Sequence, residues 1–297
     1  MDIRQKIEQL DIKSLATPRN GLFLIFAAVA FVAAYMPITA LRASGRSEYY
    51  SHIPLIPLVS LYLLLIRRKQ IAACAVYAVR CGIPVLAAAL ALFGAGQLWA
   101  AALDKNNFAS LIAFSVLVFV HGGFILTYGL KAYRIALFPL LFLLFMIPIP
   151  SAVMDGIIYL LQAGSTEFTN LLFWISGVPY MRDGFVFHLP QVSVEVAKQC
   201  SGIRSSLALF ITALLAGHLF LKTWWKVAIL AAAAVLIAMF KNGIRIITLS
   251  LLGNYVDVRI LESSLHREGG IPFFIVALLL LAPVLFFLRK TEKEKHV

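Results

Sequence analysis

The stretch from Ile271 to Leu288 reads IPFFIVALLLLAPVLFFL and contains no charged side chain. As a helix, its 18 residues would be about 27 Å long, close to the hydrocarbon thickness of a bilayer. The basic sequence Arg289-Lys290-Thr291-Glu292-Lys293 follows directly. An apolar run of this length followed by cations is typical of a transmembrane helix that ends at a cytoplasmic surface.

Similar apolar runs recur along the whole chain, of which 61% is hydrophobic and only 13% charged. These proportions exclude a soluble protein and predict an all-α polytopic membrane protein with about eight transmembrane helices. The run at 53–66 is short for a span, and we expect Tyr49 and Tyr50 to extend it at the membrane interface. The other expected spans lie at 21–41, 82–101, 108–130, 135–149, 203–221, 227–252 and 271–288.

The basic residues mark the topology. The formal net charge is +12, and 16 of the 26 basic residues form five clusters at alternate ends of successive runs, as the positive-inside rule requires. Without a basic stripe with interleaved aromatics, the charge does not indicate nucleic-acid binding. The clusters are Arg4/Lys6/Lys13/Arg19, Arg67/Arg68/Lys69/Arg80, Lys131/Arg134, Lys222/Lys226 and Arg289/Lys290/Lys293/Lys295.

The segment 157–175 decides the number of spans. If it crossed the membrane, the two last basic clusters would lie outside, so we expect a re-entrant or interfacial helix; nine spans is the alternative. Its internal Gly164-Ser165-Thr166-Glu167 favours this, because a charge and a helix breaker at mid-membrane are costly. We expect one integral membrane domain over 1–297 with both termini cytoplasmic, including a leader (1–20), an extracytoplasmic loop (177–199) and a tail (289–297). The first apolar run is predicted to be a signal anchor.

The sequence Gln199-Cys200-Ser201-Gly202-Ile203-Arg204 precedes the apolar run 203–221. A thiol at the start of a helix lies at the positive end of the helix dipole, and the Arg204 cation is one turn away. Both effects favour the thiolate, which is the nucleophilic form of cysteine. Cys200 is therefore a candidate nucleophile. Arg204 could orient the loop or assist the anion, or simply pair with Glu195 or Glu262.

Upstream of Cys200, the segment 185–198 is strand-like and alternates apolar and polar residues after Pro190. It predicts a short extracytoplasmic strand or hairpin. It is either an extended linker or a lip that pairs with an extended peptide and delivers it to Cys200.

Two further polar motifs are expected at the depth of Cys200. Arg245 is 19 residues beyond Lys226, or about 28 Å along a helix, which reaches the outer interface. Asn242 shares its helix face and can orient the guanidinium, although an arginine that snorkels to the interface is the simpler reading. His266 lies in the loop before the last span, where a histidine is more often only solvated. Thiol, imidazole and guanidinium together suffice for acyl transfer.

Other polar residues give weaker signals. His52, in Tyr50-Ser51-His52-Ile53-Pro54, is either a second base or substrate contact, or part of an interfacial aromatic belt. His188 is ambiguous in the same way, and His121 and His218 are predicted to pack. No Cys-x-x-Cys or His-x-x-x-His spacing occurs and glycine-rich phosphate loops are missing, so we expect no metal site and no cofactor. The three cysteines give no disulfide framework.

These motifs, in this order, resemble the exosortase/archaeosortase family of membrane transpeptidases. The resemblance covers residues 45–288 and rests on Cys-Ser-Gly-Ile-Arg at 200–204, Asn-Gly-Ile-Arg at 242–245 and His-x-x-x-Gly at 266–270. Tyr-Ser-His-Ile-x-Leu-Ile-Pro at 50–57 and Phe-Met-Ile-Pro-Ile-Pro at 145–150 are also similar. Ile53 departs from the glycine that family members often carry there, which puts a role for His52 in doubt.

The resemblance implies a catalytic Cys200, Arg245 and His266, with Arg204, Asn242, Ser201, Gly202 and His52 in support. It implies a bacterial inner-membrane enzyme that cleaves exported proteins at a C-terminal sorting signal of the PEP-CTERM kind: a short motif, a hydrophobic helix and a basic tail. Transfer to a surface glycan or lipid acceptor would follow at the outer face of the bilayer. No periplasmic accessory domain is fused to the chain, so a separate accessory protein is a further expected partner.

Two other functions remain open. A transporter for a lipid-linked or polysaccharide intermediate would bind its anionic substrate with Lys241 and Arg245, but it predicts polar residues through the full depth of several spans. The cytoplasmic halves here are almost purely apolar. A scaffold for envelope polysaccharide export would make no demand on Cys200.

Overall fold

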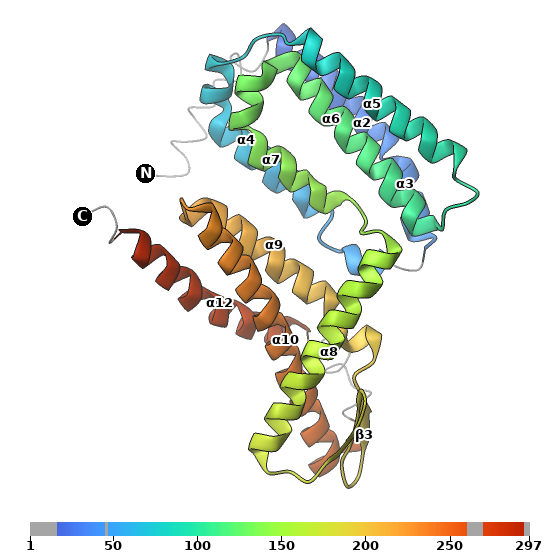
Figure 1. The fold of residues 1–297 in the computed structure, drawn as a ribbon, viewed down its shortest axis with the longest axis vertical. Helices are drawn as coiled ribbons and strands as arrows, with labels where there is room; N and C mark the ends of the chain where they lie inside the picture. Colours follow the sequence, from blue (N-terminus) through green and yellow to red (C-terminus); the bar gives the residue numbers. More distant parts are fainter. Residues whose placement is uncertain (1–16, 45–46, 260–269, 294–297) are drawn as a thin grey trace. The chain divides into compact units, whose positions relative to one another are not determined.

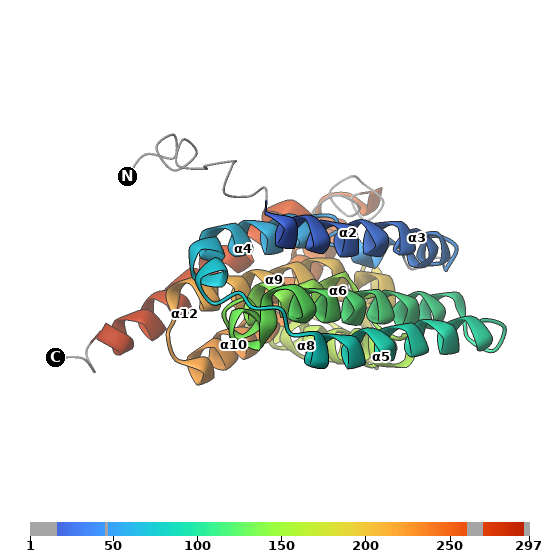
Figure 2. The same ribbon diagram turned by 90° about the horizontal axis from the view of Figure 1, so that it is seen from above.

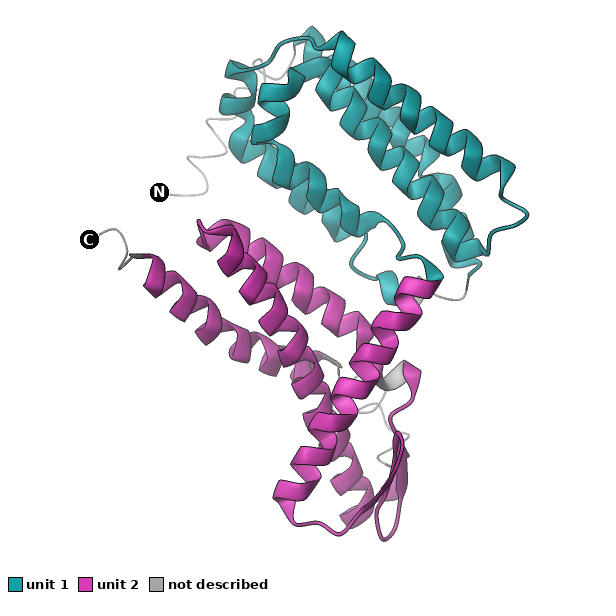
Figure 3. Cartoon of the chain, viewed as in Figure 1, with its two compact units in different colours: residues 1–151 teal, residues 152–297 magenta. Residues whose placement is uncertain are grey.

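The computed structural model describes residues 17–44, 47–259 and 270–293. They form mostly long helices and one small sheet (Figure 1; Figure 2 shows the same ribbon from above). By their internal contacts, residues 1–151 and 152–297 form two compact units, which are coloured separately in Figure 3.

Unit 1 is a group of helices packed around one long helix. The helix α6 (Lys105–Ile135) contacts α2 (Pro18–Ala33), α3 (Tyr35–Arg42), α4 (Leu55–Ala73), α5 (Val79–Leu98) and α7 (Leu137–Phe142). Short 3₁₀ helices at Ser47–Tyr50 (η2) and Leu143–Met146 (η3) complete the unit. Phe124, Ala132, Ala136 and Leu140 form part of its buried core.

Gly129 interrupts α6. Its φ of +80° lies in the left-handed region, and a Cβ there would come within 2.7 Å of the Val76 carbonyl oxygen. The connection between α4 and α5 bonds to the helix beside this break, because Val76 N–H donates to the Tyr128 carbonyl and Ala78 N–H to the Leu126 carbonyl. The backbone polar groups freed by the kink are thus satisfied inside the unit, as an apolar environment requires.

The described part of unit 2 combines a small sheet with several long helices. The helix α8 (Ser151–Ser176) leads to strands β1 (Met181–Asp183), β2 (Val186–His188) and β3 (Ser193–Glu195), which pair antiparallel in the order β1-β2-β3. The register places Arg182 opposite Phe187, and Phe187 opposite Val194. The chain continues through η4 (Lys198–Ser201), α9 (Ile203–Phe220), α10 (Trp224–Tyr255) and α12 (Gly270–Lys293).

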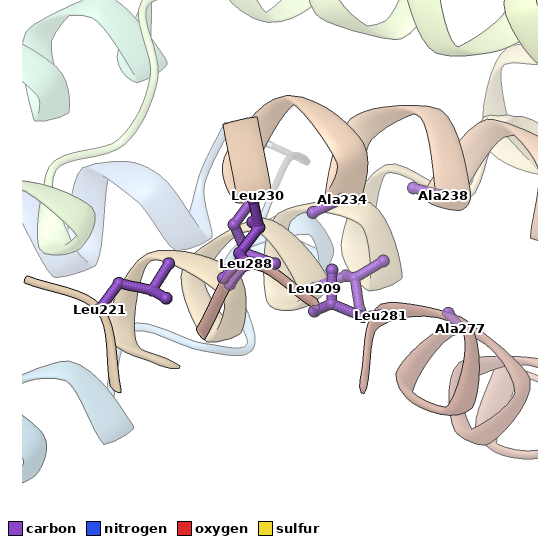
Figure 4. Packing of buried hydrophobic residues seen from close by; sticks show 9 residues of the cluster. Leu209, Leu221, Leu230, Ala234, Ala238, Ala277, Leu281 and Leu288 are labelled. Atoms are coloured by element: carbon purple, nitrogen blue, oxygen red, sulfur yellow. The ribbon is translucent and has the colours of Figure 1, made fainter. Parts of the chain in front are cut away.

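The helices α9, α10 and α12 pack on one another through leucine and alanine side chains, as Figure 4 shows from close by. Leu209 of α9, Leu230 and Ala234 of α10 and Ala277 of α12 are fully buried in this cluster. Small residues let helix backbones approach closely where lipid supplies no hydrophobic driving force.

The helices confirm an all-α polytopic membrane protein. Among the described residues, six helical segments are long and apolar enough to span a bilayer: Pro18–Arg42, Val79–Leu98, Lys105–Ile135, Ile203–Phe220, Trp224–Tyr255 and Ile271–Glu292. A seventh arises only if Leu137–Met146 and Ser151–Ser176, a bent pair, count as one span. Large apolar side chains such as Leu98 and Phe31 are more than four-fifths exposed, as expected where lipid covers them.

Three sequence expectations differ in detail from the structure. The run at 53–66 belongs to α4, which continues through Arg67, Arg68 and Lys69, and it does not qualify as a span by itself. The predicted hairpin is a sheet with a third strand, because Met181–Asp183 pairs with β2. Gly164 does not break its helix: α8 continues through residues 164–167, and Glu167 forms an ion pair with Arg182 of β1 at 2.7 Å.

Candidate active site

The segment that carries Cys200 is anchored on both sides. Upstream, Phe187 and Val196 are fully buried in a cluster with Phe173 and Ile246. The Val196 carbonyl accepts a 2.6 Å hydrogen bond from Gln162 Nε2 of α8. Four residues later Cys200 lies in η4, directly before α9. The predicted position of Cys200 at the start of a helix is confirmed, while its side chain lies outside what the structure describes.

Gly202 links η4 to α9 and requires glycine for two reasons. Its φ is +71°, and a Cβ there would lie 3.0 Å from Asn242 Oδ1 and 3.6 Å from Lys241 Nζ. A side chain would therefore be strained by the backbone and crowded by α10. The Gly202 carbonyl is held in turn by the hydroxyls of Ser205 and Ser206, which donate to it at 3.0 and 2.9 Å.

The part of α10 that faces this loop is polar and buried. Lys241 is 2% exposed and donates a 2.6 Å hydrogen bond to Ser205 Oγ in the first turn of α9. Asn242 is fully buried and donates from Nδ2 to Ser165 Oγ of α8 at 3.1 Å. The turn at 241–242 therefore connects α8, α10 and the start of α9.

Positive charge gathers around the Cys200 loop. Arg245 is partly buried one turn beyond Lys241, and its charge interacts with the Lys241 ammonium. The N-terminus of α9 contributes the positive end of a helix dipole to the same place. Such surroundings stabilise anions, including a thiolate or the oxyanion of a tetrahedral intermediate.

Comparison with protein families agrees with these motifs. A family model described as transmembrane exosortase matches residues 42–283, which is most of the chain. The chain belongs to the transmembrane exosortase family. The match includes Tyr50, the Cys200 motif, Asn242 to Arg245, and His266. Comparisons with curated proteins and with solved structures gave no match.

Of the predicted catalytic residues of this exosortase, the structure describes Arg245 and the backbone of Cys200. Gly202, in the motif containing Cys200, packs against the turn of α10 that precedes Arg245. His266 and Glu262 lie outside the described residues, so contact among Cys200, Arg245 and His266 stays a prediction. Among the residues that the structure does describe, no group of three His, Cys, Asp or Glu side chains could hold a metal ion.

His52 belongs to unit 1, between η2 and α4. Its half-buried imidazole bonds to the backbone of Phe145, and its ring centroid lies 6.4 Å from that of Tyr50. Burial lowers the pKa of His52, because desolvation disfavours the imidazolium. The neutral form that results could accept a proton, but the choice between substrate contact and interfacial residue stays open.

The sequence motifs of this exosortase gave no indication of a hydrogen-bonded cluster in unit 1. Tyr50 OH donates to Asn106 Oδ1 and to the Ile149 carbonyl, at 3.3 and 3.2 Å. Asn106 Nδ2 donates to the Ile149 carbonyl at 2.8 Å, and Ser110 Oγ to the Pro148 carbonyl at 2.6 Å. Two of the family motifs, at 50–57 and 145–150, are therefore joined through α6.

Two serines near the Cys200 loop were also missed. Ser165 and Ser205 receive hydrogen bonds from Asn242 and Lys241, yet each is one of several small polar residues in its helix. A small polar residue inside a span is a weak signal, because most serines bond to their own helix carbonyls. Ser165 at i and Glu167 at i+2 lie on different faces of α8, so the charge of Glu167 does not mark the face that bonds to Asn242.

Proposed function

We propose that this exosortase is a membrane cysteine peptidase and transpeptidase with Cys200 as its nucleophile. The observation that carries the proposal is the placement of the Cys200 loop. The loop leads directly into α9, and its Gly202 packs against the turn of α10 that precedes Arg245. Family membership supports the same chemistry.

In the first step, the Cys200 thiolate attacks the carbonyl carbon of the scissile peptide bond. Arg245 donates hydrogen bonds to the oxyanion that forms. The C–N bond then breaks, His266 gives a proton to the departing amine, and the acyl group remains on Cys200 as a thioester.

In the second step, an amine or hydroxyl of the acceptor attacks the thioester carbonyl. His266 takes the proton of the acceptor, and the C–S bond breaks to restore the Cys200 thiolate. Water in place of the acceptor would give hydrolysis by the same sequence of bonds.

The proposed substrate is an exported protein whose C-terminal sorting signal consists of a short motif, a hydrophobic helix and a basic tail. Its helix would dock beside the bundle, with the basic tail at the cytoplasmic face and the scissile bond at the outer face of the bacterial inner membrane. The acceptor would be a surface glycan or lipid, and a periplasmic accessory protein would assist.

The test is co-expression with a protein bearing such a signal, with its size followed on a gel. Cys200→Ala should abolish processing, while Cys81→Ala, which removes an exposed cysteine in the first turn of α5, should leave it intact. Arg245→Lys should reduce processing strongly, because lysine cannot reproduce the planar guanidinium. Processing by Cys200→Ala at the wild-type level would refute the assignment, and would favour a transporter or scaffold.

A further inference from the structure

Lys241 is a buried cation to which the proposed mechanism gives no task. Its side chain is 2% exposed, and its ammonium donates a hydrogen bond to Ser205 Oγ at 2.6 Å. Within the described residues it forms no ion pair with a carboxylate. Buried charges are normally paired, since an uncompensated ion costs several kcal/mol.

The hydrogen bonds of Ser205 show that Lys241 is the donor in the pair. The Ser205 hydroxyl donates its own hydrogen to the Gly202 carbonyl at 3.0 Å, so its oxygen accepts from Lys241. This arrangement suits a charged ammonium, and it leaves Ser205 without a proton to give to Lys241 as an activated nucleophile would. Lys241 therefore behaves as a donor fixed against the start of α9.

A second buried lysine on the same helix shows how such a charge is usually accommodated. Lys226, 3% exposed, donates to the Leu288 carbonyl at 3.0 Å and to Thr291 Oγ1 at 2.9 Å, near the C-terminal end of α12. The carbonyls at that end carry the negative part of a helix dipole. Lys241 meets the opposite surroundings, because it faces the positive N-terminus of α9 and the charge of Arg245.

An ammonium in a positive setting is stabilised by an anion, and the ionisable side chain closest in sequence to Gly202, which Lys241 faces, that can become one is Cys200. Lys241 Nζ lies 3.6 Å from the position that a Cβ on Gly202 would occupy, two residues after Cys200. Ser201 Oγ, beside Cys200, is buried and has no hydrogen-bond partner among the described residues. From the packed elements, hydroxyl groups of α8 and α9 face this turn, and Arg245 is the charged group that acts on Lys241.

We propose that Lys241 is a positioning residue whose buried ammonium, fixed by Ser205, stabilises the thiolate of Cys200 before the substrate binds. The inference rests on the proposed function of Cys200 as nucleophile. It assigns distinct tasks to the two cations of α10, since Arg245 serves the oxyanion and Lys241 the resting thiolate.

The experiment measures the pH dependence of Cys200 alkylation by iodoacetamide in the full-length protein in detergent. Cys74→Ser and Cys81→Ser leave Cys200 as the one thiol. The midpoint should lie below the ordinary value of about 8.5, and Lys241→Met should raise it by about one pH unit. At pH 7 the alkylation rate should then fall about tenfold. Lys226→Met removes the other buried lysine of α10 and should leave the midpoint unchanged.

Substrate processing gives a second measurement that a merely structural role would not affect. Processing by Lys241→Met should be reduced at pH 7 and should recover as the pH rises, because the thiol then ionises without help. Lys241→Gln keeps a donor for Ser205 without the charge, and it should behave in the same way if the methionine variant does not fold. Lys241→Arg should retain the lowered midpoint.

A wild-type midpoint in Lys241→Met or Lys241→Gln, with an unchanged melting temperature, would overturn the inference. It would leave the nucleophile assignment intact, since that depends on Cys200→Ala. Conversely, processing by Cys200→Ala would refute the proposed function whatever the alkylation midpoint.

Discussion

Each unit of this exosortase contains a buried polar cluster, and the two clusters differ in kind. The Asn106 cluster of unit 1 consists of Tyr50, Asn106 and Ser110 with the carbonyls of Pro148 and Ile149. The Lys241 cluster of unit 2 consists of Ser165, Ser201, Ser205, Lys241 and Asn242. The first is neutral, and each of its side-chain donors meets a backbone carbonyl, whereas the second contains a buried cation and a hydroxyl without a partner among the described residues.

This difference separates a structural task from a chemical one. A saturated neutral network fixes the Pro148–Ile149 segment against α6 and has no spare donor for a ligand. A buried cluster with an unbalanced charge costs stability, and proteins usually accept such a cost at functional sites. The contrast leads us to expect changes of stability from substitutions in unit 1, and changes of reactivity from substitutions in unit 2.

The largest effect is expected at Gly202, which lies beside Asn242 and Lys241 of the Lys241 cluster. Gly202→Ala places a Cβ 3.0 Å from Asn242 Oδ1 at a φ of +71°, so the loop must shift. Processing should fall by about 100-fold, because a small displacement of the reacting groups has an effect of that size. Gly184→Ala is the matched control, since its φ is +55° but a Cβ there meets nothing within 4 Å. Equal losses in both variants would show that backbone strain alone, and not the contact with α10, is responsible.

Asn106→Ala should act on stability instead. The variant leaves Tyr50 OH and the Ile149 carbonyl with fewer partners, which should cost about 1–3 kcal/mol of unfolding free energy. Thermal unfolding in detergent would measure the loss. The pH midpoint of Cys200 alkylation should stay at the wild-type value, and a shift in that midpoint would break the division between the two clusters.

A smaller, pH-dependent effect is expected at His52. Burial lowers the pKa of His52 in the folded protein, so protonation favours the unfolded state. The contribution of His52 to stability is complete above the unfolded pKa of about 6.5 and is lost as the pH falls below it. His52→Gln should therefore remove part of the acid sensitivity of unfolding between pH 7.5 and 5.5. Identical pH profiles of the variant and the wild type would contradict the burial of a neutral imidazole.

The smallest effect is expected on the exposed side of α8. Glu167 is 66% exposed and pairs with Arg182 at 2.7 Å, and such surface pairs contribute at most about 1 kcal/mol. Glu167→Gln should leave both unfolding and Cys200 alkylation close to wild type. A gain in stability of several kcal/mol would instead place this carboxylate in the hydrocarbon, against a re-entrant or interfacial α8.

Much of the fold follows from the sequence because lipid imposes simple rules. The run 271–288 lies in α12, since an uncharged stretch of that length must be helical in a bilayer. The kink at Gly129 was not predictable, because it depends on residues 76–78 bonding to the side of α6. The third strand was missed because Met181–Asp183 is only three residues long and has no apolar alternation.

The motifs that define the candidate site are visible in the sequence, whereas the contacts around them are not. A cysteine at a helix start and Asn242 with Arg245 near a span end are visible in the chain itself, and the structure brings their motifs together. The roles of Ser165 and Ser205 depend on which helices are neighbours, which spacing along a single helix does not determine. The same holds for Lys241, whose surroundings distinguish it from the equally buried Lys226.

The central claim, that Cys200 is the nucleophile, is tested most directly by trapping the intermediate. The enzyme is mixed with a substrate that carries the tripartite signal, quenched in acid within one turnover and mapped by mass spectrometry. We expect the N-terminal part of the substrate on the peptide that contains Cys200, released by neutral hydroxylamine as a thioester should be. A hydroxylamine-stable adduct on Ser201 or Ser205, or product formation with no adduct on Cys200, would contradict the account.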